Sequence, residues 1–219
     1  MRPAWVDAVH LGGFVLRVLL KASRTPRCER VLDGMVLVSR AVSWDGGSVV
    51  GLLGVVVCAA GPAGGVGELV SLAQGRGWDV QVIATPSALD FIDVEALERQ
   101  TGNPVRWRYR KPGEPRAPLS DAIIVAPATY NTVNKWAHGI SDTYALGVLA
   151  EAPGMGTPIV VLPFVNSALA GRHAFKESVS TLRSEGVRFV TGYGERPPRS
   201  EGDDRFPWEL ALREVERAG

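Results

Sequence analysis

Apolar runs alternate with helix-like segments through the middle of the chain, and this alternation limits the possible folds more than any other feature. The run "LLGVVVCAA" (52–60) is continuous and rich in β-branched residues, which is typical of a strand buried on both faces. The next segment, 66–77, has apolar residues at helical spacing and ends at a glycine. The chain therefore begins this region with a strand followed by a helix.

The same reading extends to residue 192. Strands are predicted at 52–60, 78–85, 105–110, 122–127, 158–163 and 187–192. Helices are predicted at 66–77, 93–102, 132–138, 142–152 and 173–185. Strands that alternate with helices predict an α/β fold, here a three-layer, Rossmann-like fold with a parallel sheet of about six strands.

The predicted elements divide the chain unevenly. Residues 49–195 carry the alternating pattern and form the predicted domain. Residues 1–48 are rich in arginine and weakly periodic, and they are interpreted as an N-terminal extension, either mobile or added upstream by a misplaced start codon. Residues 196–219 begin with the Pro-rich, charged spacer "RPPRSEGDDR", and a short helix at 208–217 is predicted to follow in this C-terminal tail.

Composition narrows the function classes. Of the 219 residues, 46% are hydrophobic and 21% charged, and the net charge is +1, so neither nucleic acid nor a membrane surface is an expected partner. The two cysteines, Cys28 and Cys58, lack metal-ligand spacing, so no metal site is predicted. Cys58 lies in a buried-strand pattern and is interpreted as a small core residue, in a protein expected in the reducing cytoplasm.

The carboxyl ends of the predicted strands are where ligands bind in such sheets. The first strand runs into "AAGPAGGVGE", whose glycines at 61, 64, 65 and 67 form neither the dinucleotide fingerprint nor a Walker A loop. Its bare backbone N–H groups could hold a phosphate, or the segment could be an ordinary Gly-rich turn. The second strand ends at Thr85 and Ser87 without a carboxylate, which favours a mononucleotide over NAD, unless these residues only cap a helix.

The next two strand ends share a pattern. In "PATYNTVNKWAHGISD" (127–142) and "PFVNSALAGRHAF" (163–175), a proline follows the strand and an asparagine comes a few residues later, at Asn131 and Asn166. Two carboxamides facing one crevice can donate to and accept from a planar heterocycle or a carboxylate. The alternative is that both asparagines cap helices.

These motifs together resemble the FMN-binding cysteine decarboxylase family of flavoproteins, which includes phosphopantothenoylcysteine decarboxylases and lantibiotic peptidyl-cysteine decarboxylases. The family signature Pro-Ala-Ser-Ala-Asn-Thr is similar to "PATYNT" (127–132). The second family motif, Pro-x-Met-Asn-x-x-Met-Trp, keeps only Pro163 and Asn166. The resemblance covers roughly residues 55–190.

The resemblance implies FMN as cofactor, bound at the carboxyl ends of the strands. Asn131 would take the family's catalytic amide position, and Asn166 would lie on the substrate side. The implied cofactor residues are Gly61, Thr85, Ser87, Ala128, Thr129, Asn131 and Thr132. The substrate would be a small molecule or peptide with a thiol or acid group. A homo-oligomer, a trimer or a multiple of it, is also implied, with Tyr130 and Trp136 at the subunit boundary.

One departure bears on catalysis. The family's catalytic His lies eight residues before the residue that aligns with Asp121, and an ungapped count places Gly113 there. The nearest alternatives, His138 and His173, are interpreted as structural. The open function classes are an FMN-dependent oxidoreductase or decarboxylase, a non-catalytic FMN-binding sensor or partner protein, and a relative of the flavin prenyltransferases. The Gly-Ala-Ser-Gly turn that is typical of the flavin prenyltransferases is not seen at 59–62 of this chain.

Overall fold

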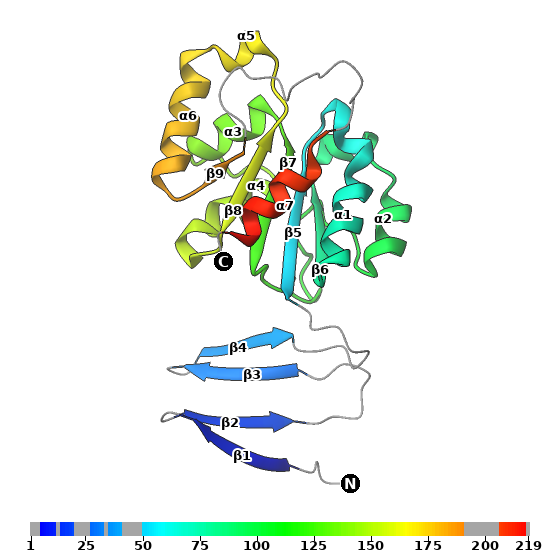
Figure 1. The fold of residues 1–219 in the computed structure, drawn as a ribbon, viewed down its shortest axis with the longest axis vertical. Coiled ribbons are helices and arrows are strands. Elements are labelled where there is room, and N and C mark those ends of the chain that lie inside the picture. The colour runs from blue at the N-terminus through cyan, green and yellow to red at the C-terminus, as the bar shows by residue number, and fades with distance from the viewer. Residues whose placement is uncertain are drawn as a thin grey trace. The chain divides into compact units, whose positions relative to one another are not determined.

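The computed structural model describes residues 5–11, 14–19, 27–32, 35–40, 50–190 and 206–217, in the two units Met1–Gly51 and Leu52–Gly219 (Figure 1). The first unit contains an antiparallel sheet in the order β1-β2-β3-β4. Its strands are β1 (Trp5–Leu11), β2 (Phe14–Leu19), β3 (Arg27–Leu32) and β4 (Met35–Arg40). The sequence pattern does not predict these four strands, and a misplaced start codon stays an open prediction.

The second unit is the predicted α/β domain, built on a five-stranded sheet in the order β6-β5-β7-β8-β9. The pairs β5–β7, β7–β8 and β8–β9 are parallel. The strands are β5 (Gly51–Val57), β6 (Trp78–Ala84), β7 (Ala122–Ala128), β8 (Ile159–Pro163) and β9 (Arg188–Phe189). The α-helices are α1 (Val66–Gly75), α2 (Val94–Thr101), α3 (Tyr130–Ala137), α4 (Tyr144–Glu151), α5 (Ser167–Ala170), α6 (His173–Ser184) and α7 (Trp208–Glu216). Three short 3₁₀ helices join them: η1 (Gly61–Gly65), η2 (Pro86–Asp90) and η3 (Pro153–Met155).

Alternate residues of the interior strand β5, and Cys58 directly after it, enter two separate cores. Val55 and Val57 are fully buried on the face covered by α1, α2 and α7. Val56 and Cys58 are buried on the opposite face, under α3, α4 and α6. Because both faces are covered, the strand is apolar throughout, which is why its sequence reads as a continuous run. The predicted three-layer, Rossmann-like fold is confirmed.

One of the six predicted strands is not formed as expected. The segment 105–110 makes only a single bridge to the sheet, between Arg106 and Ile83. The Arg106 amide donates to the Val82 carbonyl (3.0 Å), and the Arg106 carbonyl accepts from the Ala84 amide (2.8 Å). Residues 107–111 are then exposed, so no second core layer holds them against the sheet. Alternation of apolar and basic residues is typical of an edge strand, but here only one residue of the segment joins the ladder.

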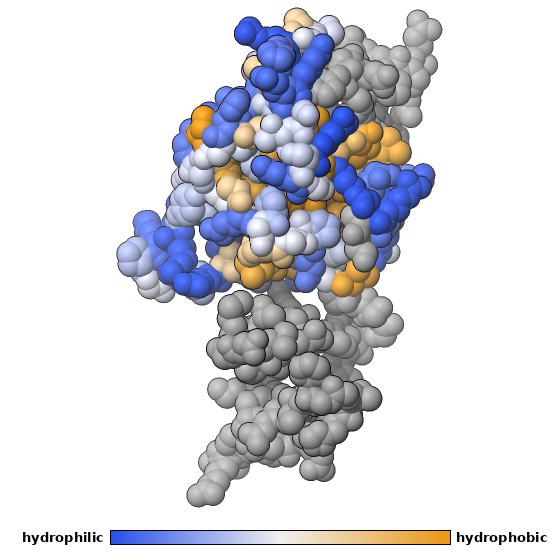
Figure 2. Space-filling view, turned by 90° about the vertical axis from the view of Figure 1, so that its left-hand side faces the viewer, coloured by the Kyte–Doolittle hydropathy of each residue, from blue (hydrophilic) through white to orange (hydrophobic). Residues whose placement is uncertain are grey.

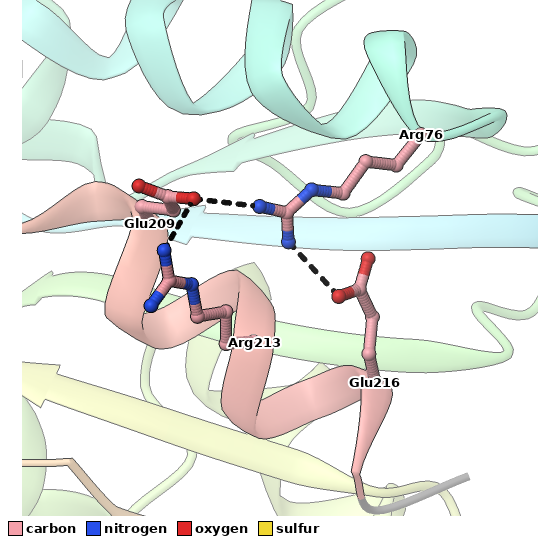
Figure 3. A network of polar contacts seen from close by, with 4 residues as sticks. All are labelled: Arg76, Glu209, Arg213 and Glu216. Carbon is pink, nitrogen blue, oxygen red and sulfur yellow. Dashed lines mark hydrogen bonds and ion pairs between the residues drawn. The ribbon is translucent and has the colours of Figure 1, made fainter.

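Helix α7 completes the core on the α1 face. Trp208 is 3% exposed and Leu212 is fully buried, in the same cluster as β5 and α1. At the surface, Arg76 at the end of α1 contacts both Glu209 and Glu216 of α7 (Figure 3). These ion pairs are solvent-exposed and contribute little, so apolar burial holds the helix. The helix confirms the one predicted at 208–217, whereas the predicted spacer at 196–205 lies outside the described residues.

Replacing the buried aromatic side chain of α7 should destabilise the domain strongly. Trp208→Ala is expected to lower the free energy of unfolding by about 3–5 kcal/mol, because a large side chain leaves the core. Leu210→Ala, two residues away on the same helix and 44% exposed, should change it by less than about 0.5 kcal/mol. Urea denaturation followed by circular dichroism measures both. Equal effects of the two substitutions would show that α7 is not packed as described.

Candidate functional site

The strand order creates one point where neighbouring connections leave the sheet in opposite directions. Strand β5 leads to β6 on one side, while β7 lies on its other side. In a sheet of this order, ligands bind at the carboxyl ends of the first and third strands, which here are β5 and β7. The site should therefore lie beyond Val57 and Ala128.

Backbone hydrogen bonds join the carboxyl ends of four strands. The Thr85 amide donates to the Val57 carbonyl (2.9 Å), linking β6 to β5. The Cys58 amide donates to the Pro127 carbonyl (3.2 Å), linking β5 to β7, and the Phe164 amide donates to the Ala128 carbonyl (2.8 Å), linking β7 to β8. The structure thus places the predicted strand-end residues along one continuous edge, which we call the carboxyl edge.

The Gly-rich segment after β5 forms η1 and then enters α1, and neither helix has a side-chain cap. A Cβ at Gly64 would lie 3.2 Å from the Phe91 carbonyl oxygen, so packing alone favours glycine there. A Cβ at Gly61 would lie 3.8 Å from the Phe164 ring, an ordinary contact. Gly61 is therefore not required by packing, and its exposed backbone lies open at the carboxyl edge.

Thr85 precedes η2 in the position of a helix cap, but its side chain makes no cap hydrogen bond. It is only 8% exposed, and its hydroxyl has no hydrogen bond to any other described residue. Ser87, in the first turn of η2, is exposed. The helix-cap alternative is thus wrong for Thr85, and its hydroxyl, unpaired among the described residues, lies at the end of β6.

Some polar residues of the motif after β7 stabilise the start of α3, and others are exposed. Thr129 caps α3 by accepting from the Thr132 amide, and the two hydroxyls are 3.0 Å apart. Thr132 is buried, and Ala128 is fully buried, so these residues shape the site from behind. Asn131 is exposed at the start of α3, and its carboxamide has no partner among the described residues. Asn131 is therefore the motif side chain available to a ligand.

Asn166 caps a helix, as one of the two alternatives predicted. Its Oδ1 accepts from the Leu169 amide (2.9 Å) at the start of α5. The side chain is exposed, and its Nδ2 donates to no described residue. One half of the carboxamide is thus committed to α5, and only the donor half could contact a substrate.

Cys58 has a role at the site that the sequence did not indicate. It is 1% exposed, and its sulfur is hydrogen-bonded by Thr132 and Thr129. Burial raises the pKa of the thiol, and the threonine hydrogen bonds oppose that rise without reversing it. A neutral thiol therefore joins the end of β5 to the start of α3. Its position directly after β5, near the end of the apolar run at 52–60, was the only available signal.

No base replaces the family histidine at the expected position. Gly113 is an exposed turn residue with φ of +88°, a conformation that favours glycine, and nothing lies within 4 Å of where a Cβ would be. The neighbouring Glu114 accepts from Arg108 and from the Lys111 amide, which lowers the pKa of its carboxyl and weakens it as a base. His138 follows the last residue of α3, and His173 begins α6 and lies 3.1 Å from Glu177, so both have the helix positions that the sequence predicts.

Two residues expected at a subunit boundary are satisfied within the chain. Trp136 is 5% exposed in the core, and Tyr130 stacks on Phe175 of α6 with ring centroids 5.5 Å apart. The expectation that Trp136 lies at a boundary is therefore wrong. The face that carries α6 is largely hydrophilic, with hydrophobic side chains in small separate groups (Figure 2).

Among the described residues, no three His, Cys, Asp or Glu side chains gather in a metal-binding arrangement. In the same part of the chain, no helix combines the length and apolar character that crossing a membrane requires.

Known proteins share the sequence pattern and the fold of this chain. The sequence pattern of the Flavoprotein family matches residues 54–204. The coenzyme A biosynthesis bifunctional protein CoaBC of Thermococcus kodakarensis is 32% identical over 133 residues, which are 56% of this chain but only 32% of that protein. The chain thus matches about a third of the length of this curated relative.

Solved structures share the fold. The FMN-dependent cysteine decarboxylase SpaF superposes with a TM-score of 0.60 at 23% identity, covering 77% of this chain and 98% of that one. The FMN binding protein AtHal3 superposes with a TM-score of 0.62 at 17% identity, with the same coverage. At these identities, the similarity shows a common fold.

The buried thiol gives a reactivity prediction. In a Cys28→Ser background, alkylation of Cys58 at mildly alkaline pH should be at least about 100-fold slower in the folded protein than in urea, because the raised pKa leaves little thiolate and the sulfur is inaccessible. The folded-state rate should rise only above the ordinary thiol pKa. Mass spectrometry of iodoacetamide-treated samples follows the reaction. Similar rates in the folded and unfolded protein would contradict the described burial.

Proposed function

We propose that this chain, which belongs to the Flavoprotein family, binds FMN at the carboxyl edge of β5, β6 and β7. The single observation that carries the proposal is Thr85. A nearly buried hydroxyl without a partner among the described residues, beside the open backbone of Gly61, is suited to a phosphate or sugar oxygen. A strand order equivalent to that of flavodoxin-like folds, whose FMN lies at the same switch point, supports this choice.

The end of β6 also favours FMN over a dinucleotide. An NAD site normally has an acidic residue there to hold the ribose hydroxyls. Here Thr85 and Ser87 stand in its place, and neither would repel a phosphate monoester. The names of two proteins with the same fold, an FMN-dependent cysteine decarboxylase and an FMN binding protein, support the same assignment.

The residues then have distinct roles. Gly61, Thr85 and Ser87 would hold the phosphate and ribitol, while Thr129 and Thr132 fix the start of α3 behind the flavin. Asn131 would donate to the flavin or to a substrate carboxylate, and Asn166 would contact the substrate through its free Nδ2. FMN, when bound, supplies a two-electron acceptor. We also propose that the chain forms a homo-oligomer. Large exposed hydrophobic side chains such as Phe91 support this. Light scattering of the flavin-loaded protein tests it.

We further propose that the chain does not oxidatively decarboxylate cysteine-ended peptides or phosphopantothenoylcysteine at a family-like rate. Gly113 has no side chain to take a proton, and the pKa of Glu114 is lowered. The second family motif has lost its methionines and tryptophan, so substrate contacts are missing as well. The alternative, a non-catalytic FMN sensor or partner protein, follows if no other substrate is found.

Two threonines distinguish cofactor contacts from helix caps. Thr85→Val should leave the stability of the FMN-free protein nearly unchanged and weaken FMN binding by about tenfold or more, because only the ligand uses this hydroxyl. Thr129→Ala should lower the free energy of unfolding of the FMN-free protein by about 1 kcal/mol, because a helix cap is lost. Quenching of flavin fluorescence and urea denaturation measure the two effects, with the exposed Ser180→Ala as control. A preparation that takes up no FMN, or a Thr85→Val variant that binds it like the unchanged protein, would refute the proposal.

The lack of a base at position 113 predicts little turnover. Incubation of flavin-loaded protein with a peptide ending in cysteine should leave the peptide mass unchanged, because loss of a general base typically lowers rates ~10²–10⁴-fold. Mass spectrometry would detect the loss of CO2 and two hydrogens. Loss of that mass, abolished by His138→Ala, would overturn the proposal and identify His138 as the base.

A further inference from the structure

The side chain of Arg106 is part-buried yet has no hydrogen-bond or ion-pair partner in the part of the chain that the structure describes. Its Nε is buried without a hydrogen bond, and no ion pair or aromatic stack joins it to any described residue. By contrast, Arg76, the other described arginine of intermediate burial, contacts two glutamates. A buried, unsatisfied guanidinium N–H is costly, so its place in the fold needs an explanation.

The backbone fixes the direction of this arginine. Both Arg106 backbone groups bond β6, at Val82 and Ala84. Arg106 pairs in parallel with Ile83, and paired residues of neighbouring strands point to the same face. Ile83 belongs to the core under α3, α4 and α6, so the Arg106 side chain leaves the sheet towards α4.

A second hydrogen-bond donor lies beside it on α4. Tyr144, the first residue of that helix, is half-buried, and its hydroxyl bonds no described residue. Burial raises the pKa of the Tyr144 phenol, and the nearby Arg106 charge acts in the opposite direction. The exposed Glu151 also acts on Tyr144 but makes no ion pair with Arg106, so no described carboxylate occupies the guanidinium.

Tyr109 holds the segment of Arg106 against α4. Its ring meets Tyr144 edge-to-face with centroids 5.5 Å apart, and its hydroxyl donates weakly to the Thr143 carbonyl (3.5 Å). A side chain at position 147 would overlap the Tyr109 hydroxyl, so Gly147 provides the space for this contact. The positive end of the α4 dipole lies at the same place.

We propose that Arg106 and Tyr144 form a binding site for an oxyanion, the carboxylate or phosphate group of a small molecule, at the outer edge of the sheet. The planar guanidinium binds two oxygens of such a group at once, and the phenol donates a third hydrogen bond. The site lies beside β6, where Arg106 pairs with Ile83, two residues before Thr85. Neither Arg106 nor Tyr144 is among the residues assigned to the proposed flavin site.

Calorimetric titration of FMN-saturated protein with inorganic phosphate and with succinate tests the site, because FMN blocks anion binding at the carboxyl edge. Saturable binding of at least one probe is expected, and it should weaken by about tenfold or more in Arg106→Met. Tyr144→Phe and Arg106→Lys should have smaller effects. Arg116→Met, which removes an exposed arginine without a described partner, should have none. Which probe binds distinguishes a phosphate from a carboxylate ligand.

Two outcomes would overturn the proposal: no saturable binding of either probe, or equal binding by Arg106→Met and the unchanged protein. If the protein takes up no FMN, the same titration on FMN-free protein still compares Arg106→Met with Arg116→Met, so the two proposals fail separately.

Melting temperature provides a second readout. Without added anion, Arg106→Met should melt at or above the temperature of the unchanged protein, because an unpaired buried charge is removed. It should also lose the rise in melting temperature that the anion causes. A lower melting temperature without anion would show that Arg106 has a structural partner and would contradict the site.

Discussion

The parallel pairing of β5 with β7 is the interaction on which the rest of the structure depends. Leu53 to Val56 pair in register with Ala122 to Val125, and both strands are buried between two helical layers. Because β6 lies on the other side of β5, the connections diverge at this pair, and their polar residues gather at one edge. Three strand-end hydrogen bonds then fix that edge across four strands.

The carboxyl edge separates polar groups that serve the fold from groups that remain free. Thr129 and Asn166 cap helices. Cys58 links the end of β5 to the start of α3 through Thr129 and Thr132. Thr85 and Asn131 serve no such purpose among the described residues. Unpaired polar side chains at the carboxyl edge indicate where a ligand supplies the missing hydrogen bonds.

The sequence predicted what depends on local pattern. The apolar runs located β5, β6, β7 and β8, and helical spacing located α1 and α7, because two-sided burial and amphipathic faces leave clear periodicities. Tertiary packing decided the rest. The segment 105–110 alternates like a strand but has no layer to cover it, so only Arg106 pairs. Trp136 is buried in the core of its own chain instead of lying at a subunit boundary. Thr85 occupies the N-cap position of η2 without making the cap hydrogen bond.

Hydrogen exchange of backbone amides, followed by mass spectrometry with and without FMN, tests the central claim most directly. FMN should protect the peptides that contain the turn after β5, the end of β6 at Thr85, and the start of α3 at Asn131. Peptides at the opposite edge, such as the one that contains Trp78 at the start of β6, should exchange unchanged. Protection confined to that opposite edge, or no protection at saturating FMN, would contradict the account.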